Sequence, residues 1–376
     1  MSDTAVRGRS ALTGWPVLVP VVAFVVLAVA WVLPEVELLL VLVAVALVGA
    51  IVTAVHHAEV VAHKVGEPFG SLVLAVAVTV IEVGLIVMLM TGGGDGASTY
   101  ARDTVFAAVM ITLNGIVGLA LLVGALKHGL VAFNAYGTGS AVATVITLAG
   151  VCLVLPSFTT SAAGREYSSS QLAFAALVSL VLYGAFVVTQ TVRHRDFFLP
   201  VTSDERGRTT GLVDLDEDGH ADPPSAREAW TSLVLLVVSL VAVVGLAKLL
   251  SPTIEAVVSD LGLPYAVVGV VIALLVLAPE SIAAVRNAAR NRVQISLNLA
   301  YGSAMASIGL TIPTVAVAMI WLSGPLELGL EPTQMILLAL TVVVTAFTLA
   351  QGRAYALQGV VHLVLLAAFL FLSVQP

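Results

Sequence analysis

About eleven continuous apolar stretches, each long enough to cross a lipid bilayer, divide this chain at its charges, glycines and prolines. A transmembrane helix needs roughly 20 apolar residues. Stretches such as 38–52 are continuously apolar and lack the alternation of a membrane β-strand. We therefore expect an all-α integral membrane protein with about 11 transmembrane helices. The predicted spans lie near 16–33, 38–62, 68–91, 103–126, 140–156, 171–192, 229–250, 265–285, 294–322, 333–350 and 354–373.

The composition excludes an ordinary soluble domain. Of 376 residues, 16 are Lys or Arg and 23 are Asp or Glu, so charged residues make up 10% of the chain, where a soluble domain carries about 25%. Hydrophobic residues make up 59%, more than a water-soluble fold could cover with polar groups. The single cysteine, Cys152, excludes an internal disulfide or a cysteine-based metal site. The sequence has no clustered basic face, which a nucleic-acid partner would require. The composition makes lipid the expected environment.

The distribution of basic residues predicts the orientation. With the N-terminus placed in the cytoplasm, three of the 16 basic residues fall outside, namely Arg102, Arg165 and Lys248, and the others fall on cytoplasmic segments. This bias follows the positive-inside rule. We therefore predict a cytoplasmic N-terminus and a C-terminus outside the cell.

One long hydrophilic segment divides the chain into two sets of five spans. It predicts a segment 1–37 with an extra first helix, a first repeat 38–192, an acidic cytoplasmic loop 193–228 and a second repeat 229–376. An odd number of spans in each half requires the halves to have opposite orientations. Such inverted repeats are common in secondary transporters.

The two predicted halves each carry one glutamate deep in a span. The motif Gly-x-Pro followed by an aromatic residue opens both spans, and Glu82 comes 14 residues after Pro68 while Glu280 comes 16 residues after Pro264. At a rise of 1.5 Å per residue, both carboxylates lie roughly 21 to 24 Å from opposite entries of the membrane. We therefore expect the two side chains at similar, near-central depths.

A carboxylate at the bilayer centre costs about 2.5 to 3.5 kcal/mol or more, so Glu82 and Glu280 need a proton, a partner or a bound cation. Burial disfavours the charged form, which lets each group hold a proton near neutral pH and release it when a cation arrives. The alternative is a protonated glutamate that only makes hydrogen bonds within the bundle. Pro279 cannot donate to the Leu275 carbonyl, which leaves backbone oxygen beside Glu280, and Ca²⁺ and Na⁺ prefer such mixed oxygen ligands. Further candidate ligands, each with a plain interhelical hydrogen bond as the alternative, are Thr79, Thr112, Asn114, Ser303 and Ser307.

Several sequence stretches resemble the Cha-type Ca²⁺(Na⁺)/H⁺ antiporters of bacteria, which belong to the calcium/cation antiporter superfamily. They are HAEVVAHKVGEPFGSL at 57–72, Val-Ile-Glu-Val at 80–83, Leu-Ala-Pro-Glu at 277–280 and Tyr-Gly-Ser at 301–303. The resemblance covers most of the chain. It implies a multi-pass antiporter of the bacterial inner membrane, in which Glu82 and Glu280 bind cation and proton alternately, with no cofactor besides the transported ions.

The same comparison leaves the cation open. Related vacuolar-type exchangers carry Gly-Asn-x-x-Glu in both repeats, whereas the matching positions here begin Val78-Thr79 and Val276-Leu277. Our first expectation is outward transport of Ca²⁺ against protons by alternating access, and the alternative is Na⁺ or K⁺/H⁺ exchange. A passive cation channel is the rival from another class, although channels usually build filters from rings or loops. An enzyme is not expected, because no motif supplies a nucleophile and base at membrane depth.

Two further motifs carry hypotheses. Asp214, Asp216, Asp218 and Asp222 fit an EF-hand-like loop, but Ser225 stands at its twelfth position where a bidentate Glu is expected. The alternative is a solvated acidic linker.

At the cytoplasmic end of the second span, Glu59 and Glu67 are candidates for a cation vestibule, and a hydrated helix end is the plainer interpretation. His362, in the last span, is expected to be a hydrogen-bonded packing residue.

Overall fold

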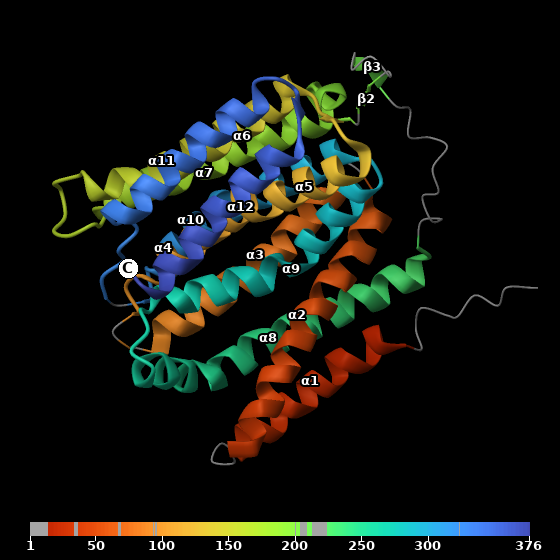
Figure 1. Ribbon diagram of the computed structural model, residues 1–376. Coiled ribbons are helices and arrows are strands. Elements are labelled where there is room, and N and C mark those ends of the chain that lie inside the picture. Colours follow the sequence, from red (N-terminus) through yellow and green to blue (C-terminus); the bar gives the residue numbers. More distant parts are fainter. Residues whose placement is uncertain are drawn as a thin grey trace, which may run out of the picture. The chain divides into compact units, whose positions relative to one another are not determined.

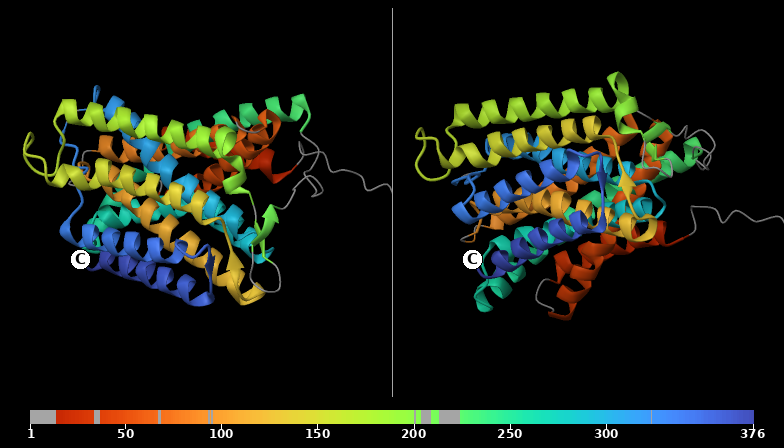
Figure 2. Two further views of the ribbon diagram at one scale, coloured as in Figure 1. Left: turned by 90° about the horizontal axis from the view of Figure 1, so that it is seen from above. Right: turned by 45° about the horizontal axis from the view of Figure 1, so that its top comes forward.

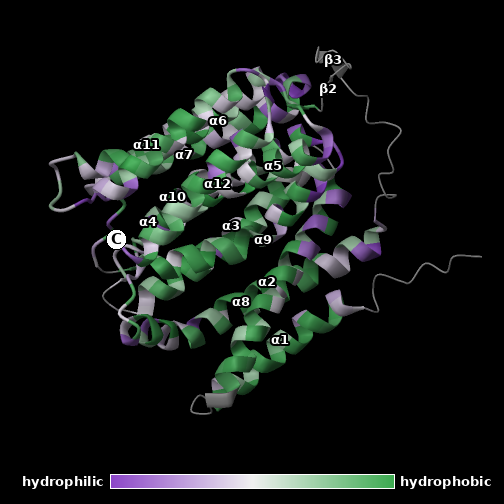
Figure 3. Cartoon of the chain, in the orientation of Figure 1, coloured by the Kyte–Doolittle hydropathy of each residue, from purple (hydrophilic) through white to green (hydrophobic). Residues whose placement is uncertain are grey.

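The computed structural model describes residues 14–33, 37–66, 69–92, 94, 96–199, 201–203, 209–212, 224–322 and 324–376. Among these residues, 11 helical segments are long and apolar enough to cross a membrane, which confirms the predicted spans. Apolar residues run along the helices, and hydrophilic residues gather mainly at the helix ends (Figure 3). The protein is therefore an all-α membrane protein.

The helices follow the predicted order (Figure 1). The α-helices are α1 (Trp15–Val32), α2 (Glu37–Val65), α3 (Phe69–Gly92), α4 (Tyr100–Met110), α5 (Val117–His128), α6 (Ala135–Ala149), α7 (Ser169–Val188), α8 (Ala226–Asp260), α9 (Ala266–Ala289), α10 (Val293–Ala318), α11 (Pro332–Leu349) and α12 (Ala356–Val374). Shorter π and 3-10 turns are η1 (Ile111–Ile116), η2 (Gly150–Val154), η3 (Leu155–Ser157), η4 (Thr189–Arg193) and η5 (Arg195–Phe198). Because η1 joins α4 and α5 without a break, the three form one span.

Two small antiparallel strand pairs accompany the helices. The first joins β1 (Val131–Ala132) to β4 (Arg353–Ala354), and the second joins β2 (Val201–Ser203) to β3 (Thr209–Leu212). Both lie in connections between spans, where backbone groups would otherwise need water as a partner.

Local signals explain several helix starts. Asn134 accepts hydrogen bonds from the backbone of Tyr136 and Gly137 at the start of α6, and Ser168 forms a capping box with Gln171 at the start of α7. Pro332 occupies the first turn of α11, where its missing N–H costs nothing. α8 differs from the predicted span, since it continues past residue 250 and through Pro252 to Asp260.

The chain divides into two compact units. Unit 1 consists of the described residues of Met1–Ala77 and His220–Leu250, and it contains α1, α2 and the first parts of α3 and α8. Within it, α1 packs along α2, where His57 Nε2 lies 2.9 Å from the Pro16 carbonyl oxygen. Lys248 of α8 lies over the Trp31 ring at 5.5 Å, so α1 contacts both α2 and α8.

Unit 2 consists of the described residues of Val78–Gly219 and Ser251–Pro376. Its centre is the span α4–η1–α5, the most buried of the described spans, and α10 is the next most buried. Helices α4, α5, α6, α7, α10, α11 and α12 run along a similar direction in all three views (Figures 1 and 2). The described candidate site residues of the deep membrane region, from Thr79 onward, all belong to this unit.

Glycines allow the close approach of helices in unit 2. A Cβ atom on Gly359 of α12 would come within 2.6 Å of the Leu122 backbone nitrogen in α5, and one on Gly269 of α9 within 2.8 Å of Asp103 backbone in α4. Backbones this close leave no room for a side chain, as in other membrane helix seams. Gly118 of α5 packs on Gly359 and His362 of α12.

Candidate functional site

Glu82 is buried in the part of α3 that belongs to unit 2. Its side chain accepts a hydrogen bond of 2.6 Å from the Ser307 hydroxyl in α10. Thr311, one turn further along α10, also faces this carboxyl group. Ser303, Ser307 and Thr311 recur at every fourth position, so they share one face of α10. This face of α10 brings hydroxyl oxygens to Glu82, one of the two glutamates predicted from the sequence.

Glu280 is the second buried carboxylate. It lies on α9 at 7% exposure, while Glu82 is 4% exposed, and the two are close enough to interact electrostatically. The structure therefore brings the two glutamates together, although α3 and α9 come from different predicted repeats. Two interacting carboxyl groups away from water are costly when both are ionised. A proton or a cation relieves that cost.

The helix around Glu280 is continuous. α9 runs through Pro279 without interruption, and proline has no N–H to donate to the Leu275 carbonyl. The Ser281 hydroxyl donates to the Leu277 carbonyl oxygen at 2.7 Å. The side chain of Leu275 is half-buried.

The other predicted ligands differ in their surroundings. Thr79 is buried one turn before Glu82, and Ser303 is half-buried. The Thr112 hydroxyl donates to the Ala108 carbonyl oxygen of its own helix at 2.7 Å, and Asn114 hydrogen-bonds Thr341 at 2.9 Å. Among these predicted auxiliary residues, Ser307 donates a hydrogen bond to Glu82.

Thr311 was not among the predicted ligands. Its spacing from Ser307 on the same face of α10 is the signal that would have selected it. Within the described residues, no cluster of three or more His, Cys, Asp or Glu side chains could hold a metal ion. A cation at Glu82 and Glu280 would thus complete its shell with hydroxyl, backbone or water oxygens, which hard cations accept.

The two secondary hypotheses concern other parts of the chain. Glu59 is exposed on α2, close enough to His63 to interact with it electrostatically. Glu67, the other candidate for the vestibule, lies outside the described residues, as do Asp214, Asp216, Asp218 and Asp222 of the acidic loop.

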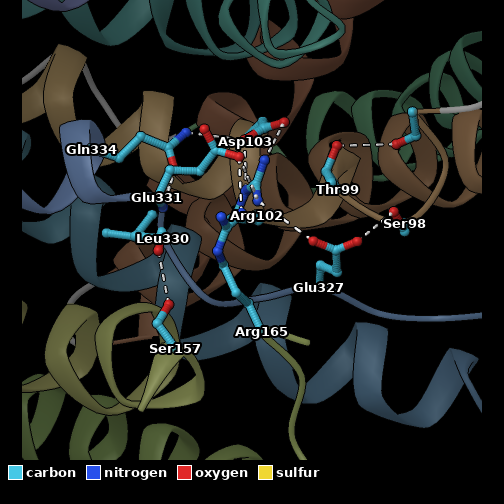
Figure 4. A network of polar contacts seen from close by, with 11 residues as sticks. Ser98, Thr99, Arg102, Asp103, Ser157, Arg165, Glu327, Leu330, Glu331 and Gln334 are labelled. Atoms are coloured by element: carbon cyan, nitrogen blue, oxygen red, sulfur yellow. Dashed lines mark hydrogen bonds and ion pairs between the residues drawn. The ribbon is translucent and has the colours of Figure 1, made fainter. Parts of the chain in front are cut away.

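A second polar cluster lies at one end of unit 2 (Figure 4). Arg102 Nε and Asp103 Oδ1 form an ion pair of 2.8 Å with both side chains buried, and Gln334 donates to Asp103 at 3.2 Å. Arg165 and Glu331 pair at 2.9 Å. Arg102 and Arg165 are two of the three basic residues predicted outside, and they lie in one cluster because Glu331 is within 4.0 Å of both. A cavity of about 290 Å³ opens beside Arg102, Asp103 and Glu331.

The family described as sodium/calcium exchanger protein matches residues 35–192 and 231–375. The chain is 45% identical over 369 residues to the putative ionic transporter y4hA of Sinorhizobium fredii, with 96% of each chain covered. It is 32% identical over 373 residues to the sodium-potassium/proton antiporter ChaA of Escherichia coli, with 98% of each covered.

Among solved structures, native YfkE, also described as a Ca²⁺/H⁺ antiporter, has the same fold. The TM-score is 0.70 at 15% identity, and the alignment covers 96% of this chain and 99% of YfkE. The sequence match extends over both halves of the chain and includes both membrane glutamates. The chain belongs to the sodium/calcium exchanger protein family, within the calcium/cation antiporter superfamily.

Proposed function

We propose that this secondary transporter exports Ca²⁺ in exchange for protons, with Glu82 and Glu280 as the shared cation and proton site. The observation that carries the proposal is the buried carboxylate pair with the Ser307 hydroxyl 2.6 Å from Glu82. A solvent-excluded pair of this kind has a cost that either protons or a cation can remove. Competition for the same oxygens couples the two ions.

Ser307 suits both states of such a site. A hydroxyl donates to an ionised carboxylate, and it accepts from a protonated one. Glu82 can therefore gain or lose its proton while its contact with Ser307 persists. When a cation binds, the hydroxyl keeps its hydrogen bond to the ionised carboxylate and an oxygen lone pair faces the ion, as hard cations require.

Charge balance sets the expected ratio. Two carboxyl groups that release about two protons for one Ca²⁺ leave the site with the same net charge in both states. Alternating access follows when helix movements expose the site to one side of the membrane at a time. The ions and protons are the partners in this scheme, and the inner membrane is the proposed location, with the N-terminus in the cytoplasm.

A second candidate is Na⁺ or K⁺/H⁺ exchange at the same glutamates. The similarity to ChaA, a sodium-potassium/proton antiporter, over 98% of both chains favours it. The similarity in fold to YfkE, described as a Ca²⁺/H⁺ antiporter, accompanies the first candidate. Exchange of a monovalent cation would need about one proton per ion for electrical balance.

The test is proton-driven uptake into everted membrane vesicles. ⁴⁵Ca²⁺, ²²Na⁺ and ⁸⁶Rb⁺ are supplied in parallel to vesicles with the wild-type protein, Glu82→Gln or Glu280→Gln, and Glu327→Gln serves as a control because it removes a glutamate outside the site. We expect wild-type Ca²⁺ uptake to stop when a protonophore dissipates the proton gradient. Glu82→Gln and Glu280→Gln should each abolish this uptake, and Glu327→Gln should retain it.

Other outcomes change the assignment. Uptake of ²²Na⁺ or ⁸⁶Rb⁺ without ⁴⁵Ca²⁺ would favour the second candidate. Cation flux that ignores the proton gradient, or survives both site substitutions, would contradict an antiporter with a shared site and favour the channel.

A further inference from the structure

The central span of unit 2 contains a π turn at its middle. In η1 the N–H of Val117 bonds to the carbonyl oxygens of Thr112 and Asn114. A continuous α-helix would direct this N–H to Leu113. The Leu113 carbonyl therefore does not receive this N–H, and a buried carbonyl needs another donor. π turns within α-helices occur often at functional positions.

His362 of α12 offers a donor at this turn. The ring is fully buried beside the Leu113 carbonyl, and its Nδ1 lies 3.3 Å from Asn114 Oδ1. Both of these oxygens accept, so the proton belongs on Nδ1. Nε2, 3.2 Å from the Thr348 hydroxyl, then accepts from it. The neutral imidazole is satisfied on both sides in this tautomer.

Asn114 is held from two sides. Its amide nitrogen donates to Thr341 Oγ1 at 2.9 Å, and its oxygen faces His362. Thr341 and Thr348 both lie on α11, two turns apart. A continuous set of hydrogen bonds thus joins the π turn to α11 and α12, and it fixes the side chain of Asn114 within the bundle.

The π turn adjoins the helices of the exchange site. η1 packs against α9, which carries Glu280, and against α10, which carries Ser307. α12 holds the same span closely, since a Cβ atom on Gly118 would come 3.1 Å from the Gly359 carbonyl oxygen. A change in the shape of η1 therefore changes the surface against which α9 and α10 pack.

We propose that His362 is a positioning residue for ion exchange: by donating to Leu113 and holding Asn114, it keeps the π turn of η1 formed beside the helices that carry Glu280 and Ser307. The inference rests on the proposed function of these glutamates. His362 need not touch the transported ion. It acts through η1, in the same way that residues around a metal site orient the ligands without touching the metal.

The first test compares His362→Ala with His362→Gln. Alanine removes the donor of His362. The Leu113 carbonyl would then regain the Val117 N–H if η1 relaxed to an α-helix, which would turn the side chains of η1. We expect the cation concentration for half-maximal proton-driven uptake to rise about 10-fold, the lower end of the range for loss of an orienting partner, with a smaller change in maximal rate. Glutamine keeps a donor and an acceptor, and its half-saturating concentration should lie closer to wild type than to alanine.

A matched pair on α11 separates this role from packing. Thr348→Val and Thr345→Val make the same change at two buried positions one turn apart. Of these two threonines, Thr348 is the one that hydrogen-bonds His362. Thr348→Val should raise the half-saturating concentration, and its effect should be less than additive with His362→Ala, as for residues in one network. Thr345→Val should match wild type.

The measurements use purified full-length protein in proteoliposomes, the cation that wild type transports, and thermal unfolding of each variant. The inference is overturned if His362→Ala leaves the half-saturating concentration unchanged, if it lowers only thermal stability or maximal rate, or if Thr345→Val behaves like Thr348→Val. If wild type shows no coupled uptake, or Glu82→Gln and Glu280→Gln retain it, the proposed function fails and this inference fails with it. Coupled, glutamate-dependent uptake with wild-type behaviour of His362→Ala refutes the inference alone.

Discussion

Removal of the Ser307 hydroxyl should shift the competition between protons and cations at Glu82. The hydroxyl donates a 2.6 Å hydrogen bond to Glu82 Oε1 in a buried site, and hydrogen bonds to charged groups contribute about 1.5 to 3 kcal/mol. In Ser307→Ala this stabilisation of the ionised carboxylate is lost. At about 1.4 kcal/mol per tenfold change, cation binding should weaken roughly 10- to 150-fold at a fixed pH.

The sign of the pH effect follows from the same contact. A donor to the carboxylate favours its ionised form, so its removal makes Glu82 hold its proton more tightly. The pH at which cation uptake is half-maximal should move upward by about 1 to 2 units, because one unit corresponds to 1.36 kcal/mol. Ser307→Thr keeps a hydroxyl and should stay close to wild type.

The assay is uptake in proteoliposomes at a series of pH values and cation concentrations, with Ser179→Ala as the control. Ser179 is also buried, but its hydroxyl donates to the Ala176 carbonyl of its own helix. A Ser307→Ala profile that coincides with that of Ser179→Ala, or one that moves to lower pH, would refute this account of the contact.

Three other changes test the fold around the site. Arg102→Met leaves the buried Asp103 carboxylate without its ion partner and should lower the free energy of unfolding by about 3 to 5 kcal/mol. The side chain of Arg165 is 38% exposed, so Arg165→Met should cost about 1 kcal/mol or less. Equal losses of unfolding free energy in detergent denaturation would contradict this difference in burial. Gly359→Ala places a Cβ atom against the backbone of α5 and should lower the free energy of unfolding by about 1 to 3 kcal/mol. Gly139→Ala places its Cβ atom in open space and should be neutral. Equal melting temperatures of the two variants would argue against tight packing of α5 on α12. Burial, with a smaller electrostatic effect of Cys152, raises the pKa of Tyr167 to about 12. The difference in tyrosinate absorbance between wild type and Tyr167→Phe should therefore appear near pH 12. A difference near pH 10 would instead place this side chain in solvent.

The number and order of the spans were predictable because hydropathy follows directly from composition along the chain. The end of α8 was not, since Pro252 and Glu255 read as the start of a loop. Proline is tolerated inside membrane helices when neighbouring groups satisfy the backbone, and α8 continues to Asp260. The π turn η1 inserts a local change of backbone hydrogen bonding that leaves no pattern in the sequence of Ile111–Ile116.

The site was partly predictable for a related reason. A carboxylate in an apolar run is conspicuous, so Glu82 and Glu280 could be selected by residue type and depth alone. Which hydroxyl reaches a carboxylate depends on the rotation of α10 about its axis, so the sequence offered Ser303 and Ser307 without choosing between them. The contacts of His362 with η1 join segments far apart in the chain and emerge only from the packed helices.

Proton release on cation binding tests the shared site most directly. Ca²⁺ is added to purified, weakly buffered protein with a pH indicator, and bound ⁴⁵Ca²⁺ is counted in the same sample. The account predicts about two protons released per bound Ca²⁺ near neutral pH, and loss of both Ca²⁺ binding and proton release in Glu82→Gln and in Glu280→Gln. Ca²⁺ binding without proton release, or release that is unchanged in these variants, would contradict the claim that cation and proton share these two carboxylates.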